Sequence, residues 1–274
     1  MSPDLLVHET TYRKKDLASL VHRERLRVVR EIFAKRVPAS AASWADFGCS
    51  NGFIIETIVK TRERPFARIV GYDHKEELLA LARGKSIPNA EFRLFNLNEV
   101  GDVTERFDVV TSFETLEHVA SYQTAFVNLY NHLADGGVLI VTVPNEIGFI
   151  GLAKFLGRMA LRRNAYPEFF SDRSKMDYAK TLITGGAVET FRKPSPGGYG
   201  PHLGFDYRRL EHFVREGFLA PGKLTVTERF FSGLKMNVVY VFGRAATRRD
   251  TGRHLAASPG NFNGPPKPST TASR

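Results

Sequence analysis

The sequence of 274 residues is poor in cysteine, with Cys49 alone, and has one tryptophan. A single cysteine excludes a disulfide framework and a zinc site built on several thiolates, so no metal is expected, and it favours a reducing, cytoplasmic setting. The sequence also lacks an apolar run near the roughly 20 residues that a membrane-spanning helix needs. Its first residues lack the basic-then-apolar order of a secretory signal. We therefore expect a cytoplasmic globular protein, which the hydrophobic content of 42% also indicates.

Acidic residues are in the minority, since 29 Asp and Glu stand against 39 Lys and Arg, for a net charge of +10. Such an excess is found in nucleic-acid-binding proteins. Part of it, however, lies in residues 244–274, which carry six bases and one acid among Ser, Thr, Pro and Gly. We expect this basic tail to be disordered because it has little apolar surface to bury. The rest of the chain shows no basic stripe interleaved with aromatic residues, so nucleic acid is not an expected partner.

Short apolar runs alternate with helical patterns through the middle of the chain. We expect strands at residues 43–47, 68–72, 91–95, 107–112 and 137–143, helices at 53–61, 75–83 and 121–133, and a leading helix at about 15–37. A helix near 206–216 and two strands at 223–230 and 237–242 close the chain. Parallel strands need crossover connections, which the helices supply. The pattern therefore predicts an α/β fold with a doubly wound sheet and helices on both faces.

The alternation breaks after residue 144, where Gly and Pro become frequent. This irregular segment predicts an insertion that covers one edge of the sheet. The expected organisation has five parts: an N-terminal helical cap at 1–38, an α/β core at 39–144, a lid or substrate insertion at 145–205, a closing helix and strand pair at 206–243, and the basic tail at 244–274.

The first expected strand runs into a glycine-rich turn. Asp46 is followed by Gly48, Ser50 and Gly52 at every second position, and a helix begins directly after. Glycine lets the backbone approach a ligand, and the N–H groups of the helix N-terminus suit a carboxylate. A dinucleotide-binding turn, G-x-G-x-x-G, needs a third glycine where Phe53 stands. The spacing therefore argues against a nicotinamide dinucleotide.

Asp46-x-Gly48-x-Ser50-x-Gly52 resembles the acidic-x-Gly-x-Gly-x-Gly motif of class I S-adenosylmethionine-dependent methyltransferases, with serine at the middle glycine. Cys49 lies within the same turn. The resemblance implies that the core binds S-adenosyl-L-methionine in this turn. It also implies the seven-stranded, Rossmann-like sheet of that family, with a lid insertion after the fifth strand.

Two further strand ends match the family. Asp73 ends the second strand, where a carboxylate can accept hydrogen bonds from both ribose hydroxyls, and His74 follows it. Asn96 and Leu97 follow the third strand, where the family contacts adenine, often through Asp. By this resemblance Asn96 hydrogen-bonds the adenine amino group.

Residues 113–119, Phe-Glu-Thr-Leu-Glu-His-Val, resemble the Glu-x-Leu-Glu-His-Val motif of the branch that includes ubiquinone-biosynthesis O-methyltransferases (methyltransferase types 11 and 23). The resemblance places Phe113 beside the cofactor and Arg25 on its methionine carboxylate. An oxygen acceptor needs a general base, for which histidine is suited. His118 and His202 are the candidates. The alternatives are a helix-start role for His118 and a plain loop position for His202.

The expected activity is O-methylation of a small-molecule, lipid-linked or glycan hydroxyl. The alternatives are an N-methyltransferase acting on a small molecule and a non-catalytic S-adenosylmethionine-binding protein. We expect His132, which lies in a helical segment, at the surface.

Residues 147–163 predict an amphipathic helix at the start of the insertion. Apolar residues recur at helical spacing on one side and basic residues recur four apart on another, namely Phe149, Leu152, Leu156 and Met159 against Lys154, Arg158 and Arg162. A basic amphipathic helix can lie in a membrane interface. The segment is therefore expected to be a lid helix over the acceptor, a peripheral contact with the inner membrane surface, or both.

Overall fold

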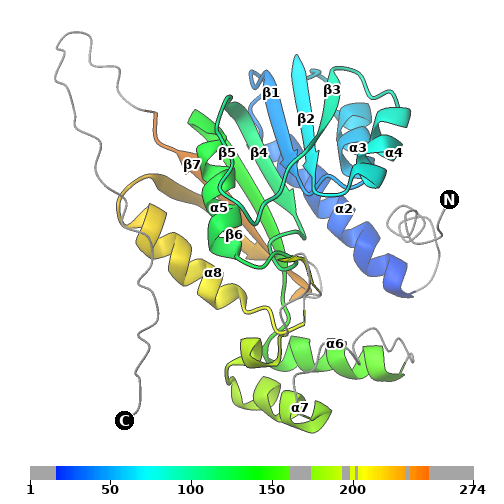
Figure 1. Ribbon diagram of the computed structural model, residues 1–274, viewed down its shortest axis with the longest axis vertical. Coiled ribbons are helices and arrows are strands. Elements are labelled where there is room, and N and C mark those ends of the chain that lie inside the picture. Colours follow the sequence, from blue (N-terminus) through cyan, green and yellow to red (C-terminus); the bar gives the residue numbers. More distant parts are fainter. Residues whose placement is uncertain (1–16, 161–173, 193–197, 201–202, 233–234, 247–274) are drawn as a thin grey trace, which may run out of the picture.

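A mixed sheet of seven strands organises the part of the chain that the computed structural model describes, which is residues 17–160, 174–192, 198–200, 203–232 and 235–246 (Figure 1). The order across the sheet is β3-β2-β1-β4-β5-β7-β6. Strands β1 to β5 run parallel, whereas β7 is antiparallel to both β5 and β6. The bounds are β1 Ser43–Phe47, β2 Arg68–Asp73, β3 Ala90–Leu94, β4 Phe107–Phe113, β5 Leu133–Pro144, β6 Leu224–Phe231 and β7 Asn237–Arg244. The predicted α/β class and the seven-stranded sheet are confirmed.

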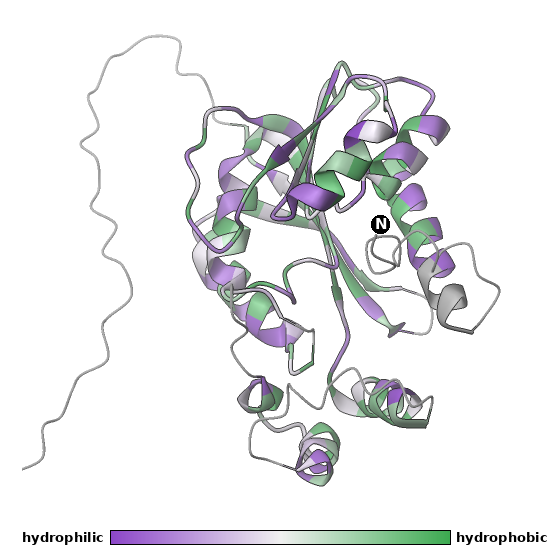
Figure 2. Cartoon of the chain, turned by 45° about the vertical axis from the view of Figure 1, so that its right-hand side comes forward, coloured by the Kyte–Doolittle hydropathy of each residue, from purple (hydrophilic) through white to green (hydrophobic). Residues whose placement is uncertain are grey.

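Helices cover both faces of this sheet, as Figure 1 shows. Helices α2 (Leu17–Arg36), α3 (Phe53–Thr61) and α4 (Glu76–Gly84) lie on one face, and α5 (Tyr122–Asn131), α8 (Tyr207–Val214) and the π-helical turn η4 (Arg215–Leu219) lie on the other. Neighbouring strand residues point to opposite faces. Val109 therefore joins the core beneath α2, α3 and α4, and Val110 joins the core beneath α5 and α8. Because both faces are buried, the central strands are mainly apolar. Figure 2 shows hydrophobic and hydrophilic residues alternating along the helices that flank the sheet.

The segment after β5 forms a small lobe beyond the end of the sheet (Figure 1). It contains α6 (Gly148–Ala160), α7 (Lys175–Thr184) and the 3₁₀ turn η2 (Val188–Phe191). The lobe has its own apolar cluster, in which the ring of Tyr178 lies 5.2 Å from the rings of both Phe155 and Phe191. The insertion thus has a core separate from the two that cover the sheet.

Two of the three basic residues predicted on one side of α6 pair with an acid that lies outside the helix. Lys154 Nζ lies 3.1 Å from Glu146 Oε1, and Arg158 donates to both Glu146 oxygens at 2.9 and 2.8 Å. Glu146 is 1% exposed. The acid precedes the helix in sequence and therefore does not appear in the helical pattern. Arg162 lies outside the described residues.

His132 is buried, so its predicted surface position is also wrong. It caps the end of α5 directly before β5, where the chain turns into the sheet. Its Nδ1 lies 2.8 Å from the carbonyl oxygen of Asn128, and its ring packs on the edge of Phe47. Burial lowers the pKa of His132. The position at a helix end, rather than on a helix face, explains the error.

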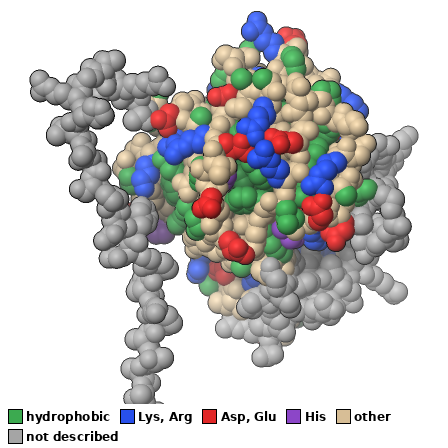
Figure 3. All heavy atoms as spheres, turned by 45° about the horizontal axis from the view of Figure 1, so that its top comes forward, with side chains coloured by type: hydrophobic (Ala, Val, Ile, Leu, Met, Phe, Trp, Pro, Cys, Tyr) green, Lys and Arg blue, Asp and Glu red, His purple; other side chains and the backbone are tan. Residues whose placement is uncertain are grey.

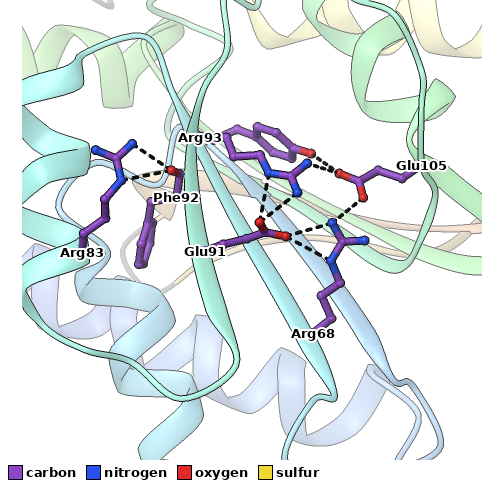
Figure 4. Close-up of polar contacts among 7 residues, drawn as sticks. Arg68, Arg83, Glu91, Phe92, Arg93 and Glu105 are labelled. Carbon is purple, nitrogen blue, oxygen red and sulfur yellow. Dashed lines mark hydrogen bonds and ion pairs between the residues drawn. The ribbon is translucent and has the colours of Figure 1, made fainter.

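An ion-pair network fixes the connection between β3 and β4 to the neighbouring strands (Figure 4). Arg68 and Arg93 each bind both Glu91 and Glu105, and Tyr72 donates a hydrogen bond of 2.9 Å to Glu105 Oε1. Burial raises the pKa of Glu105, but the hydrogen bonds from Tyr72 and Arg68 outweigh it and the net pKa is lowered. The connection that follows β3 is therefore held in place by charge.

On the face that Figure 3 shows, the described Lys and Arg side chains intermix with Asp and Glu. No continuous basic patch forms among the described residues of that face. Within the described ranges, no helix has both the length and the apolar character to cross a membrane.

Candidate functional site

A cavity of about 670 Å³ opens where β1, β2 and β4 end. The strand order reverses between β1 and β4, and doubly wound sheets bind ligands in the crevice at that point. Its size lies in the range of small-molecule sites, roughly 300–1,000 Å³. The turns after the strands and the leading helix supply the lining: Arg25, Asp46, Phe47, Gly48, Cys49, Ser50, Asn51, Phe53, Ile54, Tyr72, Asp73, His74, Lys75, Leu78, Phe95, Leu97, Phe113, Glu114, Thr115, His118, Tyr199 and Gly200.

The turn after β1 requires glycine for two reasons. Gly48, Ser50 and Gly52 have φ angles of 83°, 52° and 72°, in the left-handed region that favours glycine. A Cβ on Gly48 would lie 2.2 Å from Thr115 Oγ1, which belongs to the turn after β4. The two turns are therefore in direct contact, and Ser50 occupies a left-handed position that costs a serine more than a glycine.

Asp73 connects this turn to the end of β2. Its Oδ2 accepts a hydrogen bond of 2.9 Å from the Ser50 N–H, and its Oδ1 accepts one of 3.1 Å from the Lys75 N–H. The N–H groups of Gly48 and Cys49 donate to the Tyr72 carbonyl at 2.7 and 3.0 Å. The carboxylate is thus oriented by backbone donors on both sides.

Asp46 lies beneath the turn and is almost completely buried. Burial raises its pKa to about 7, against a hydrogen bond of 2.6 Å from Thr111 Oγ1, and the nearby Asp73 carboxylate raises it further. The pKa of the buried Cys49 thiol is also raised well above its usual value, first by burial and then by Asp46 and Asp73. Cys49 is therefore a protonated thiol of the wall and not a nucleophile.

Tyr199, from the insertion, lies against the ends of β2 and β3. Its ring stacks on His74 with centroids 3.6 Å apart and planes within 8°. Its hydroxyl accepts a hydrogen bond of 3.1 Å from the Leu97 N–H and donates one of 3.1 Å to Asn96 Oδ1. Sequence reasoning missed Tyr199 because it stands in an aperiodic segment rich in Gly and Pro, with no motif to mark it.

The turn after β4 carries two carboxyl groups, of which Glu114 lines the cavity and Glu117 is buried. Glu114 has a φ of 51° and pairs with Arg25 at 3.2 Å between Oε2 and Nη1. Glu117 is 1% exposed, and burial, with the nearby Glu114, raises its pKa well above the usual value. Both acids belong to the motif of the turn, yet neither was predicted as a site residue.

His118 follows Glu117 and lines the cavity. Its Nδ1 lies 2.6 Å from the Gly200 carbonyl oxygen. A carbonyl only accepts, so Nδ1 carries the hydrogen and Nε2 is the basic nitrogen of the neutral ring. Burial lowers the His118 pKa, while the Gly200 bond opposes it. Arg192 holds this turn by donating to the carbonyls of Glu117 and Val119 at 2.7 and 2.9 Å.

The structure brings most of the predicted site residues to this cavity. Ten of them line it: Arg25, Asp46, Gly48, Cys49, Ser50, Asp73, His74, Leu97, Phe113 and His118. Gly52 lies just behind the wall, where a Cβ would touch Phe92, and Asn96 reaches the cavity through Tyr199. His202 lies outside the described residues.

Residues 11–182, more than half of the chain, match the methyltransferase domain family. The chain is 30% identical over 123 residues to a trans-aconitate 2-methyltransferase of Variovorax paradoxus, covering 45% of this chain and 46% of that protein. It is 29% identical over 136 residues to a juvenile hormone acid O-methyltransferase of Bombyx mori (46% of each chain), and 26% identical over 130 residues to a ubiquinone biosynthesis O-methyltransferase of Sinorhizobium fredii (46% and 50%). The chain thus matches about half the length of these curated relatives.

Solved structures share the fold over most of the chain. The magnesium protoporphyrin IX methyltransferase of Synechocystis PCC 6803 with bound SAH superposes with a TM-score of 0.56 at 12% identity, covering 89% of this chain and 95% of that one. The plantazolicin methyltransferase in complex with SAH gives the same TM-score and identity, with coverage of 89% and 91%. At this identity the likeness concerns the architecture.

Proposed function

The chain belongs to the class I S-adenosylmethionine-dependent methyltransferases, and from this membership we propose that it methylates a hydroxyl oxygen of a small acceptor, free, lipid-linked or part of a glycan. The observation that carries the proposal is the single cavity wall that joins the glycine turn, Asp73 and His118. Relatives named as O-methyltransferases support oxygen as the acceptor atom.

The described residues fit S-adenosylmethionine at several points. At Gly48 a side chain would collide with Thr115, so the cavity wall there consists of backbone. Asp73 has a carboxylate held by two backbone N–H groups, and such a group suits ribose hydroxyls. Asn96 Oδ1 and the Leu97 N–H offer an acceptor and a donor side by side, the pair that the adenine edge requires. Arg25 lines the same cavity, where Glu114 holds its guanidinium at 3.2 Å and where that guanidinium suits the methionine carboxylate.

The chemistry divides between cofactor and chain. When bound, S-adenosylmethionine would supply a methyl group attached to a positively charged sulfur, which leaves readily as a neutral thioether. The chain has to align the acceptor, exclude water and accept the hydroxyl proton. His118 Nε2 takes that proton, because the Gly200 bond holds the hydrogen on Nδ1 and the lowered pKa keeps the ring neutral.

Binding of S-adenosylhomocysteine, measured by titration calorimetry, tests the cofactor assignment. We expect the wild type to bind and Asp73→Ala to bind more weakly by about 1–3 kcal/mol, because paired polar groups lose their acceptor. Asp102→Ala, a change at an exposed acid outside the cavity, is the matched control. Equal affinity of wild type and Asp73→Ala, or no binding by the wild type, would contradict the assignment.

A second experiment distinguishes the enzyme from a binding protein. The wild type is incubated with methyl-labelled S-adenosylmethionine and panels of hydroxyl and amine acceptors. Label on a hydroxyl supports the proposal, and label on amines alone contradicts oxygen as the acceptor. Tight cofactor binding without any labelled product identifies a non-catalytic binding protein.

A further inference from the structure

Tyr199 lies where the adenine ring belongs if the function proposed above is correct. We propose that Tyr199 is an internal occupant of the adenine slot and that the cofactor has to displace it, so that the Tyr199 side chain controls cofactor entry. This inference rests on the proposed function, because the slot is defined by the residues assigned there to adenine.

The stacking geometry is the first argument. His74 follows the ribose-binding candidate Asp73, so its ring is placed to lie against the base attached to that ribose. The phenol of Tyr199 covers this ring at 3.6 Å and 8°, the separation and tilt of a stacked aromatic pair. An adenine ring cannot stack on the same face of His74 at the same time.

The hydrogen-bond pattern is the second argument. Adenine presents an acceptor, N1, next to a donor, the 6-amino group. The Tyr199 hydroxyl presents the same pair, since it accepts from the Leu97 N–H and donates to Asn96 Oδ1, both at 3.1 Å. The phenol therefore satisfies the same two groups at the end of β3 that the adenine edge would satisfy.

The backbone around Tyr199 is fixed, and this limits how it can leave. The Gly200 N–H donates to the His118 carbonyl at 2.7 Å, and Asn98 Nδ2 donates to the Gly198 carbonyl at 3.1 Å. Tyr199 itself forms a β-bridge with Val119. A rotation of the Tyr199 side chain frees the slot without breaking these bonds, so His118 keeps its Nδ1 partner during exchange.

An occupied slot lowers the apparent affinity of the protein for the cofactor. If the slot is open for only a fraction of the time, the apparent Kd equals the Kd of the open form divided by that fraction. Removing the occupant therefore has to strengthen binding, in contrast to the loss caused by removing an ordinary contact residue.

Calorimetry with S-adenosylhomocysteine on the full chain tests this. We expect Tyr199→Ala to lower Kd by about tenfold, as for a slot open about a tenth of the time. Tyr199→Phe, which keeps the ring but leaves the Leu97 N–H and Asn96 without the hydroxyl, should lower Kd by less. Tyr207→Ala is the matched control, because Tyr207 is partly buried against Phe231 and outside the cavity.

Weaker or unchanged binding by Tyr199→Ala would overturn the proposal, since it would make Tyr199 a contact of the bound cofactor or a bystander. A crystal structure of the S-adenosylhomocysteine complex gives an independent answer. The Tyr199 hydroxyl should be away from the Leu97 N–H, and its presence there beside bound ligand would contradict displacement. Failure of wild type and both Tyr199 variants to bind would contradict the proposed function, whereas normal wild-type binding with an unaltered variant contradicts this inference alone.

Discussion

Burial makes the ionised form of Asp46 unfavourable in the folded protein. Asp46 is a buried residue of β1 that accepts one hydrogen bond from Thr111 of β4, and the Asp73 carboxylate lies nearby. A buried carboxylate with a pKa of about 7 disfavours the folded state whenever it is ionised.

Asp46→Asn should change how stability depends on pH. The folded-state pKa of about 7 lies above the usual 3.8, so between these values the folded state holds more protons than the unfolded state. The free energy of unfolding therefore falls as pH rises through this window. We expect the variant, compared with wild type, to be more stable at pH 8 than at pH 5 by about 1–3 kcal/mol, measured by urea unfolding. A stability difference between variant and wild type that is the same at both pH values would show that Asp46 does not carry this shift.

The turn after β4 is the element where cofactor site, base and insertion meet. Thr115 closes on Gly48, His118 binds Gly200, and Arg192 secures the carbonyls on either side of His118. The backbone of this turn is held by partners from β1 and from the insertion. Its histidine is therefore positioned before any acceptor arrives.

His118→Gln should separate catalysis from binding. Glutamine can still donate to the Gly200 carbonyl but has no basic nitrogen, so turnover should fall by about 10²–10⁴-fold with little change in S-adenosylhomocysteine affinity. Burial lowers the His118 pKa below 6.5, so the wild-type rate should be level above pH 6.5 and decline on further acidification, when the ring becomes protonated. Full turnover by the variant would remove His118 as the base.

The elements were predictable from the sequence because their causes are local. Strand β1 alternates between two buried faces, and the motifs at Gly48 and Asp73 mark turns whose chemistry depends on adjacent residues. The Tyr199 contact was not predictable, since its bond to Leu97 spans 102 positions. Glu146 was missed for a different reason: it precedes α6 and pairs with Lys154 and Arg158, 8 and 12 positions along the chain, so it lies outside the helical pattern.

At the scale of the molecule, the α6–α7 lobe stands apart from the sheet and presents apolar side chains to solvent. Phe149 is 83% exposed, and Leu156 and Met159 on the same helix are 53% and 47% exposed. Met176 and Ile183 add to this on α7. Since Glu146 pairs with both Lys154 and Arg158 and offsets one of their two positive charges, we expect membrane contact of the described lobe to depend more on apolar insertion than on charge.

Liposome flotation tests this membrane hypothesis. The wild type should float with vesicles, whereas the Phe149→Ser, Leu156→Ser and Met159→Ser triple variant should remain in solution because the apolar contact is lost. Binding should change little between low and moderate salt. Val226→Ser, at an exposed valine on β6, is the control. A wild type that does not float leaves the lobe as a cover for the acceptor alone.

The place of β7 between β5 and β6 has a consequence for synthesis on the ribosome. The strand that covers β5 is the last of the described strands, so β5, with its run of Val138, Leu139, Ile140 and Val141, is an uncovered edge until residues 237–244 have emerged. Exposed apolar edges recruit other strands, and nascent multi-strand chains aggregate through them. In the finished sheet the outer strand on this side is β6, where the charged Glu228 and Arg229 and the register shift between Val226 and Glu228 disfavour such pairing. We therefore expect a chain that terminates before β7 to be prone to aggregation, and pairing of β7 with β5 to remove this tendency.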